Sequence, residues 1–243
     1  MKKFCTSILV LVVLLFVQSV IAQTTTSTLA KGKLIIVGGG SMPDTMYQLF
    51  AKSIGGKDQS VVVIPTPAFI KAIQNAKGIY FSGGDQSRIA DAFLGTQVHA
   101  AMLALFQNGG VFMGTSAGAT IMGSLLVGGD ARKDLTKPFD FPAALNLFKN
   151  TAIDQHVLAR NRQFDLIPVI EQHPLLLGIA IDESTAIVVE GNQFSVLGKS
   201  YAMVYDAQNW DEQKKQWGRV LKPFLMIAQP QRYDIEKRKV IRN

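Results

Sequence analysis

An apolar run that ends at a serine enclosed by small residues constrains the fold of this chain more than any other stretch. Gly114, Ser116 and Gly118 fit the G-x-S-x-G pattern of a nucleophile elbow, in which a strand enters a sharp turn and a helix leaves it. Val111–Met113 predicts the strand, and the small, apolar segment Ala119–Leu126 predicts the helix. The pattern favours an α/β fold that exposes the Ser116 hydroxyl; a glycine-rich turn with an incidental serine is the alternative.

The N-terminal segment Met1–Ala22 has the pattern of a secretory signal peptide. Two lysines precede the apolar run Ile8–Val17, and Val20–Ala22 is a small-residue cleavage pattern, so we expect cleavage before Gln23. An uncleaved membrane anchor is the alternative, although the run is shorter than the roughly 20 residues that span a bilayer. We therefore expect a secreted or periplasmic protein without stable membrane association, which begins with a disordered leader, Gln23–Ala30.

Composition narrows the chemistry. The only cysteine, Cys5, lies in the expected signal peptide, so the mature chain has no thiol for disulfides, nucleophilic catalysis or metal binding, and we expect neither a metal nor a cofactor. The formal net charge is +7, with much of the excess near the C-terminus. No nucleic-acid-binding module accompanies these charges, so a solvated basic face is expected, with attraction of anionic substrates as a second interpretation.

The remaining chain, Lys31–Asn243, alternates strands and helices and predicts one α/β domain. Expected strands are Lys33–Val37, Ser60–Ile64, Lys77–Phe81, Asn150–Asp154, Gly178–Asp182, Thr185–Glu190 and Asn192–Gly198. Expected helices are Pro43–Ile54, Ala68–Ala76, Ile89–Gln107 and Leu166–Gln172, and Gly128–Leu147 is expected to be a loop. The pattern indicates a mainly parallel sheet flanked by helices, followed by a C-terminal β-hairpin region. Loops after the first, third and elbow strands should share one edge of that sheet.

The glycines Gly38–Gly40 follow the first expected strand, where a dinucleotide-binding loop could begin. Pro43 stands where the third glycine of a G-x-G-x-x-G fingerprint would fall, so the dinucleotide interpretation is weak.

A serine hydroxyl needs a neighbouring base, and histidine is the usual one. His99 lies in a helical pattern and His173 precedes a proline, so structural roles are favoured for both; His156 follows a strand and should lie on the same edge as Ser116. A carboxylate should fix the imidazole tautomer. Four residues qualify by type, and spacing does not choose among them: Asp154, Asp165, Asp182 and Glu183.

Four motifs, in order along the chain, carry a family resemblance. They are Gly83-Gly84-Asp85-Gln86, Gly114-Thr115-Ser116-Ala117-Gly118-Ala119, Asp154-Gln155-His156 followed by Arg160 and Arg162, and Gly178-Ile179-Ala180-Ile181-Asp182-Glu183-Ser184-Thr185-Ala186. Together they resemble cyanophycinase and its relatives, a family of serine exopeptidases that includes aspartyl dipeptidase (peptidase E). The resemblance implies a fold like the class I glutamine amidotransferases, with serine in place of cysteine. It also implies hydrolysis of an amide bond next to an aspartyl residue through an acyl-enzyme.

The resemblance assigns roles to residues. It implies Ser116 as nucleophile, His156 as base, Glu183 as acid, and backbone N–H groups near Gly84 and Ala117 as oxyanion donors. It places six residues at the substrate: Asp85, Gln86, Asp154, Gln155, Arg160 and Arg162. Arginine suits this role because its planar fork matches a carboxylate. The implied partner is a peptide containing aspartyl residues, and relatives of this kind are often homodimers.

Two departures from the family pattern bear on the substrate and the sheet. Asp165 stands where relatives usually have a third arginine, which reverses a charge at the expected cleft. A helix and a strand usually present before the third expected strand are missing, because Phe69 follows the second strand almost at once. The sheet could therefore be one strand narrower.

Two other functions compete with the peptidase. An esterase of the α/β-hydrolase kind shares the elbow but orders its triad serine, acid, histidine, and would use Asp154 or Asp165 with His173. A non-catalytic binding protein on the same scaffold is the third hypothesis.

Overall fold

The computed structural model describes residues 31–64, 70–127 and 143–242. The expected signal peptide and leader, Phe69 and most of the expected loop Gly128–Leu147 lie outside the described residues.

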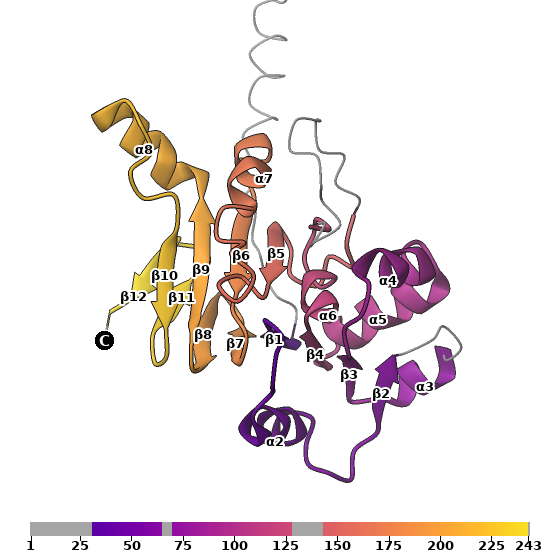
Figure 1. Ribbon diagram of the computed structural model, residues 1–243. Helices are drawn as coiled ribbons and strands as arrows, with labels where there is room; N and C mark the ends of the chain where they lie inside the picture. The colour runs from indigo at the N-terminus through magenta and orange to yellow at the C-terminus, as the bar shows by residue number, and fades with distance from the viewer. Residues whose placement is uncertain (1–30, 65–69, 128–142, 243) are drawn as a thin grey trace, which may run out of the picture.

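Two β-sheets form the framework of the described chain (Figure 1). The eight-stranded sheet contains β1 (Lys33–Val37), β2 (Val61–Ile64), β3 (Gly78–Phe81), β4 (Val111–Thr115), β7 (Thr185–Glu190), β8 (Gln193–Gly198), β11 (Arg232–Asp234) and β12 (Lys239–Ile241). The four-stranded sheet contains β5 (Thr151–Gln155), β6 (Leu177–Ile181), β9 (Tyr201–Asp206) and β10 (Leu225–Ala228). Their orders are β12-β11-β8-β7-β1-β4-β3-β2 and β10-β9-β6-β5.

Parallel pairing in the described chain is confined to six strands, five of which lead to the expected site. β2, β3, β4 and β1 pair in parallel, as do β5 and β6, whereas β7, β8, β11 and β12 add antiparallel pairs on the other side of β1. The short helix α3 (Ile70–Asn75) suffices as the crossover between β2 and β3, and β2 ends the sheet. The predicted α/β class with a C-terminal hairpin region is confirmed.

Alternating side chains of β1 supply two cores, one on each face of the large sheet. Ile35 and Val37 pack with helix α2 (Asp44–Ser53), while Leu34 and Ile36 face the opposite core. This period of two is the signature of a strand that is buried on both faces. Helix α2 therefore lies on one side of the sheet and helices α4 (Gln86–Phe93) and α5 (Gln97–Gln107) on the other (Figure 1).

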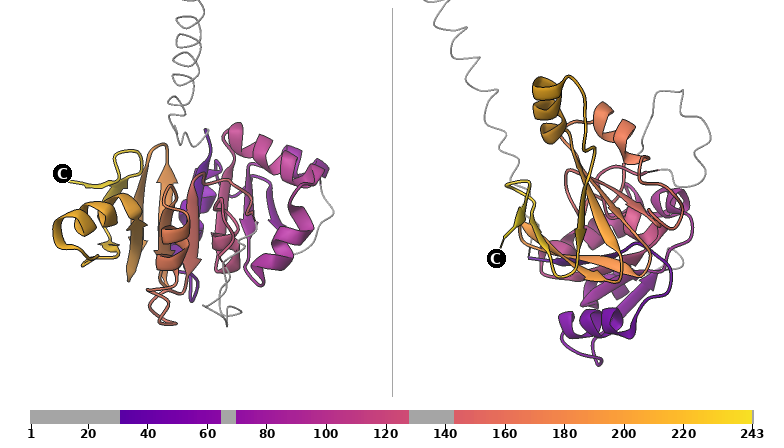
Figure 2. Two further views of the ribbon diagram at one scale, coloured as in Figure 1. Left: turned by 90° about the horizontal axis from the view of Figure 1, so that it is seen from above. Right: turned by 60° about the vertical axis from the view of Figure 1, so that its left-hand side comes forward.

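The small sheet packs on the large one across this second core. Ile179 and Val204 of the small sheet belong to the same buried cluster as Ile187 and Phe194 of the large sheet. Helices α7 (Leu166–Gln172) and α8 (Ala207–Trp217) cover the outer face of the small sheet. Figure 2 shows α8 and the C-terminal strands at the opposite end of the molecule from α4 and α5.

The prediction of one helix over Ile89–Gln107 was wrong, because two helices occupy this region. α4 begins earlier, where the Asp85 carboxylate caps it, and ends at Phe93. Gly95 then adopts a φ of +73°, and the hydroxyl of Thr96 accepts the N–H of His99 to start α5.

Helix α8 was not predicted, because the sequence analysis expected only a β-hairpin region in the C-terminal part of the chain. Its signals are a cap at each end: Asp206 accepts the N–H of Gln208, and Gly218 adopts a left-handed conformation at the C-terminus.

Within residues 31–64, 70–127 and 143–242, no single helix is long and apolar enough to cross a membrane. α4 and α5 reach that length and composition only as a pair, and they are bent by 98° at the break between them.

The aromatic centre of the second core should dominate stability. Phe112 is fully buried, with its ring centroid 5.5 Å from Phe106 and 6.4 Å from Phe81. We expect Phe112→Ala to lower the free energy of unfolding by about 3–5 kcal/mol, measured by urea denaturation, because it removes apolar contacts and leaves a cavity. Trp217→Ala is the control: this ring is 60% exposed, so a change within about 0.5 kcal/mol is expected. Equal losses in the two variants would contradict this assignment of the core.

Candidate active site

Ser116 occupies the sharp turn between β4 and helix α6 (Ala117–Thr120). Its backbone has φ +55° and ψ −122°, a conformation that side chains rarely adopt. A Cβ on Gly114 would collide with the Gly118 carbonyl, and a Cβ on Gly118 would collide with the Phe81 carbonyl. The small residues predicted around the serine are therefore required by close backbone packing, and the turn has the geometry of a nucleophile elbow.

The helix after the elbow is shorter than the predicted segment Ala119–Leu126. α6 ends at Thr120, and the carbonyls of Ile121, Met122 and Gly123 accept N–H groups from the segment 145–148 instead of continuing a helix. A four-residue helix contributes little macrodipole. Any oxyanion stabilisation here must therefore come from individual N–H groups, such as that of Ala117, the first helical residue.

His156 follows β5 and reaches Ser116 from the second sheet. Its Nε2 lies 3.0 Å from the Ser116 Oγ, and its imidazole is almost fully buried. Its backbone has φ +54°, and its N–H donates to the Gly38 carbonyl at 2.8 Å. The backbone bond fixes a strained residue at the point where its ring meets the serine.

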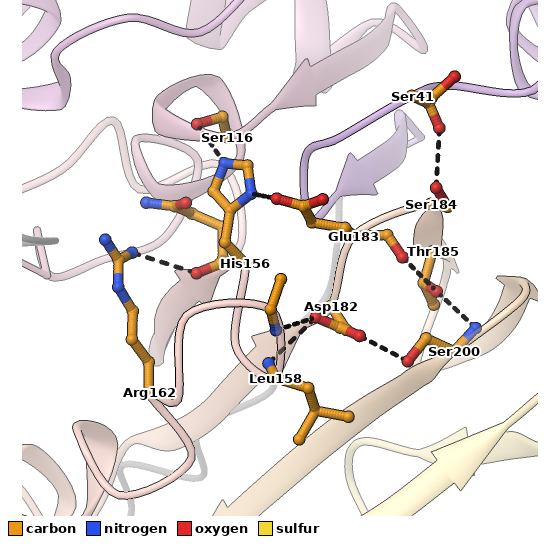
Figure 3. Close-up of polar contacts among 12 residues, drawn as sticks. Ser41, Ser116, His156, Leu158, Arg162, Asp182, Glu183, Ser184, Thr185 and Ser200 are labelled. Atoms are coloured by element: carbon orange, nitrogen blue, oxygen red, sulfur yellow. Dashed lines mark hydrogen bonds and ion pairs between the residues drawn. The ribbon is translucent and has the colours of Figure 1, made fainter.

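Glu183 lies in the turn between β6 and β7. Its Oε1 is 2.6 Å from the Nδ1 of His156 (Figure 3). Because an ionised carboxylate only accepts hydrogen bonds, Nδ1 carries the proton, which leaves Nε2 to accept the Ser116 hydroxyl. The next residue, Ser184, has φ +55° and donates its hydroxyl to the Ser41 carbonyl at 3.0 Å. Of the four carboxylates left open by spacing, Glu183 is thus the one that contacts the imidazole.

The glycines Gly38–Gly40 pack against the His156–Glu183 pair, a role that sequence analysis missed. Cβ atoms built on the three glycines would collide in turn with the Asp182 carbonyl, the His156 ring and the Glu183 side chain. Gly39 and Gly40 also have φ values of +110° and +69°. The signal was present as three consecutive glycines after a buried strand, but they were considered only as a dinucleotide-binding loop, an interpretation that Pro43 made weak.

Asp182 holds the loop that follows His156. Its Oδ1 accepts the N–H groups of Leu158 and Ala159, both at 3.0 Å, and its Oδ2 accepts the Ser200 hydroxyl at 2.6 Å. Burial acts to raise the pKa of Asp182, but the hydrogen bonds from Ser200 and from the backbone of Ala159, Glu183 and Leu158 outweigh it, and the pKa lies below its ordinary value. The ionised carboxylate therefore stabilises the fold at neutral pH, and this contribution is lost as the pH falls through the folded-state pKa.

The motif after β3 lies beside the elbow. Gly83 packs on the Thr115 carbonyl and the Ser116 Cβ, whereas the Cβ position of Gly84 is open. The Asp85 carboxylate caps α4, and the Gln86 amide donates to the Val127 carbonyl at 3.1 Å. Asp85 and Gln86 thus shape this side of the site through contacts within the chain.

Most of the remaining residues expected at the substrate are buried in and after β5, next to His156 in the chain. Asp154, Gln155 and Arg162 are all buried; Arg162 Nη1 lies 3.7 Å from Asp154 Oδ1 and donates to the Gln155 carbonyl at 3.2 Å. Their side chains are thus occupied within the chain and offer no open surface. Arg160 is exposed, and its N–H donates to the His156 carbonyl. Asp165 precedes α7, and its N–H donates to the Arg162 carbonyl.

The other two histidines have structural placements. His99 Nε2 lies 3.1 Å from the Leu145 carbonyl, and His173 ends α7 before β6 begins, whereas the site lies where β6 ends. The structure therefore does not support the pairing of His173 with Ser116 that the esterase hypothesis requires. In the described part of the chain, no group of three or more histidine, cysteine, aspartate or glutamate side chains could hold a metal ion.

The fold and the site together define the architecture of a serine hydrolase: an α/β framework, an elbow serine, and a histidine and a carboxylate in hydrogen-bonded series. The model of peptidase family S51 matches residues 41–197, and the chain therefore belongs to this family.

Relatives agree with this assignment and with the resemblance predicted from the four motifs. The cyanophycinase of Trichormus variabilis is 33% identical over 139 residues, 56% of this chain and 47% of that protein. The cyanophycinase of Synechococcus elongatus is 27% identical over 188 residues, 72% of this chain and 58% of that protein. The chain thus spans about half the length of the curated relatives it matches.

Two solved structures share the fold. A peptidase from an acI-B1 Actinobacterium superposes with a TM-score of 0.63 at 17% identity, covering 86% of this chain and 98% of that one. A putative peptidase E from Listeria monocytogenes EGD-e gives a TM-score of 0.51 at 16% identity, covering 70% of this chain and 99% of that one.

The contact between Gly39 and the imidazole gives a sharp test of the site. We expect Gly39→Ala to slow labelling of Ser116 by a fluorophosphonate by about 100-fold or more, because the new methyl group displaces the His156 ring and small misplacements cost about that much. The matched control is Gly56→Ala, since Gly56 has a similar φ of +115° but no atom within 4 Å of its Cβ position. Equal labelling rates in the two folded variants would contradict the proposed packing.

Proposed function

We propose that this chain is a serine-type exopeptidase of the cyanophycinase kind, which hydrolyses amide bonds next to aspartyl residues through an acyl-enzyme. The observation that carries the proposal is the series of hydrogen bonds from Ser116 through His156 to Glu183, at 3.0 and 2.6 Å. Membership of peptidase family S51 supports the peptidase reaction.

The proposed reaction has two halves. Ser116 Oγ attacks the amide carbonyl as His156 Nε2 takes the hydroxyl proton, and the oxyanion accepts hydrogen bonds from the N–H groups of Ala117 and Gly84. His156 then passes the proton to the leaving amine as the C–N bond breaks, leaving an ester on Ser116. A water molecule attacks this ester with His156 again as base, releasing the acid and restoring the hydroxyl. Glu183 holds the imidazole in the required tautomer throughout.

The aspartyl preference rests on the cyanophycinase relatives and on the residues around the base. Arg160 is exposed one helical turn beyond His156, where its guanidinium suits a substrate carboxylate. Arg162 is buried beside Asp154, so it would act on substrate through the position of the base. Because Asp165 stands in place of a third arginine, we propose that the substrates are not limited to β-aspartyl-arginine.

Amino-acid release from a substrate panel tests the function. We expect purified Gln23–Asn243 to release product from cyanophycin, β-aspartyl dipeptides or α-aspartyl dipeptides. Ser116→Ala and His156→Ala should each lower this rate at least 1,000-fold, because nucleophile and base act as one unit. Arg160→Ala should raise KM more than it lowers kcat.

One serine substitution and one histidine substitution, both away from the site, serve as controls. Ser195→Ala on β8 and His173→Ala after α7 should keep the wild-type rate. Turnover of simple esters alone, with loss in His173→Ala, would replace the peptidase with the esterase hypothesis. A folded protein that neither hydrolyses the panel nor reacts with a fluorophosphonate would be a binding protein.

We also propose that the chain is exported and processed at Ala22. Expression of Met1–Asn243 with its N-terminus intact should yield a mature protein outside the cytoplasm that begins at Gln23, because the n-region, apolar run and small residues fit signal peptidase. N-terminal sequencing of each cell fraction measures this outcome. A cytoplasmic protein that begins at Met1 would refute it.

A homodimer stays a prediction, to be measured by light scattering.

A further inference from the structure

Asp182 is the residue next to Glu183, yet its carboxylate points to different partners. Figure 3 shows it between the loop that follows His156 and the strand β9 that begins after Ser200. Its Oδ1 accepts the N–H groups of Leu158 and Ala159, each at 3.0 Å. The strained backbone of His156 is therefore tied on its C-terminal side to a carboxylate at the end of β6.

The second carboxylate oxygen reaches the turn that carries Glu183. Oδ2 accepts the Ser200 hydroxyl at 2.6 Å, the Ser200 N–H donates to Thr185 Oγ1 at 2.9 Å, and Thr185 Oγ1 donates to the Glu183 carbonyl at 3.2 Å. One side chain thus connects, by hydrogen bonds alone, the segment that holds the base with the segment that holds the acid.

We propose that Asp182 is a positioning residue that keeps the His156 imidazole and the Glu183 carboxylate aligned. The proposal rests on the proposed function, since it assigns a role within the same site. Asp182 touches neither the serine nor the imidazole by any hydrogen bond in the described structure, so it acts through the two segments it ties together.

A carboxylate suits this position because several donors converge on it, among them the N–H groups of Leu158 and Ala159 and the Ser200 hydroxyl. Both oxygens are acceptors, and bonds to an ionised group are stronger than neutral ones. An asparagine would keep one acceptor oxygen but turn an NH2 group toward the Ser200 hydroxyl. The change preserves size while weakening the connection, and reacting groups that shift by about 1 Å lose on the order of 100-fold in rate.

The test compares Asp182→Asn and Ser200→Ala with Asp234→Asn. Asp234 is a matched control: its carboxylate also accepts a backbone N–H, that of Lys237 at 2.8 Å, but it lies on β11, away from the site. We expect Asp182→Asn to slow fluorophosphonate labelling of Ser116 by about 10-fold or more and to lower kcat with little change in KM. Ser200→Ala should lower both rates in the same direction. Asp234→Asn should match wild type.

A double-mutant cycle with Glu183→Gln separates positioning from general weakening of the fold. If Asp182 acts by aligning His156 with Glu183, Asp182→Asn should change the labelling rate by less than about 3-fold once Glu183 has been replaced. An equal loss in both backgrounds would overturn the proposal. Should Asp182→Asn fail to fold, Ser200→Ala carries the same cycle, because it removes only the Oδ2 bond.

A measurement that does not need activity keeps this proposal distinct from the peptidase. His156 Nδ1 and Glu183 Oε1 lie 2.6 Å apart, so the proton on Nδ1 should give a low-field NMR signal that Glu183→Gln removes. We expect Asp182→Asn and Ser200→Ala to weaken or shift this signal and Asp234→Asn to leave it intact. An inactive wild-type protein that shows this pattern would refute the peptidase but support the positioning role. An unchanged signal in Asp182→Asn would overturn the positioning role.

Discussion

The carboxyl end of β1 is the constraint on which the site depends. Three successive carbonyl oxygens, those of residues 37–39, accept the N–H groups of Ser116, His156 and Ser184 at 3.1, 2.8 and 3.0 Å. Each donor belongs to a different segment: the elbow, the loop after β5, and the turn that carries Glu183. A single stretch of backbone therefore sets the spacing of Ser116, His156 and Glu183 before any side chain contributes.

The site lies where the two sheets meet, and this placement carries a conformational cost. Ser116 leaves the large sheet, His156 leaves the small one, and Glu183 lies in the turn that passes between them. Ser116, His156 and Ser184 all have φ near +55°, each costing on the order of 1–3 kcal/mol. A backbone hydrogen bond returns only about 1 kcal/mol, so these conformations persist because the buried strands on both sides fix their ends.

Sequence reasoning went furthest where local chemistry decides the outcome. The elbow glycines, the strand that delivers His156 and the strand β1 were all readable, because close backbone approach and burial leave marks at fixed spacing. The arrangement of two sheets could not be read, since it depends on strands far apart in the chain. For the same reason the role of Gly39 was missed. Its missing side chain makes room for the ring of His156, which follows a strand of the other sheet.

The choice among the four candidate carboxylates also depends on contacts that the sequence does not show. Asp154 and Asp182 are buried and hold backbone or arginine, whereas the side chain of Glu183 is 39% exposed. Exposure weakens the field that a carboxylate exerts, because water screens it. Glu183 therefore contributes chiefly through direction, fixing which imidazole nitrogen faces Ser116. That direction depends on neighbours that hold the turn, and Asp182 is bonded to that turn through Ser200 and Thr185.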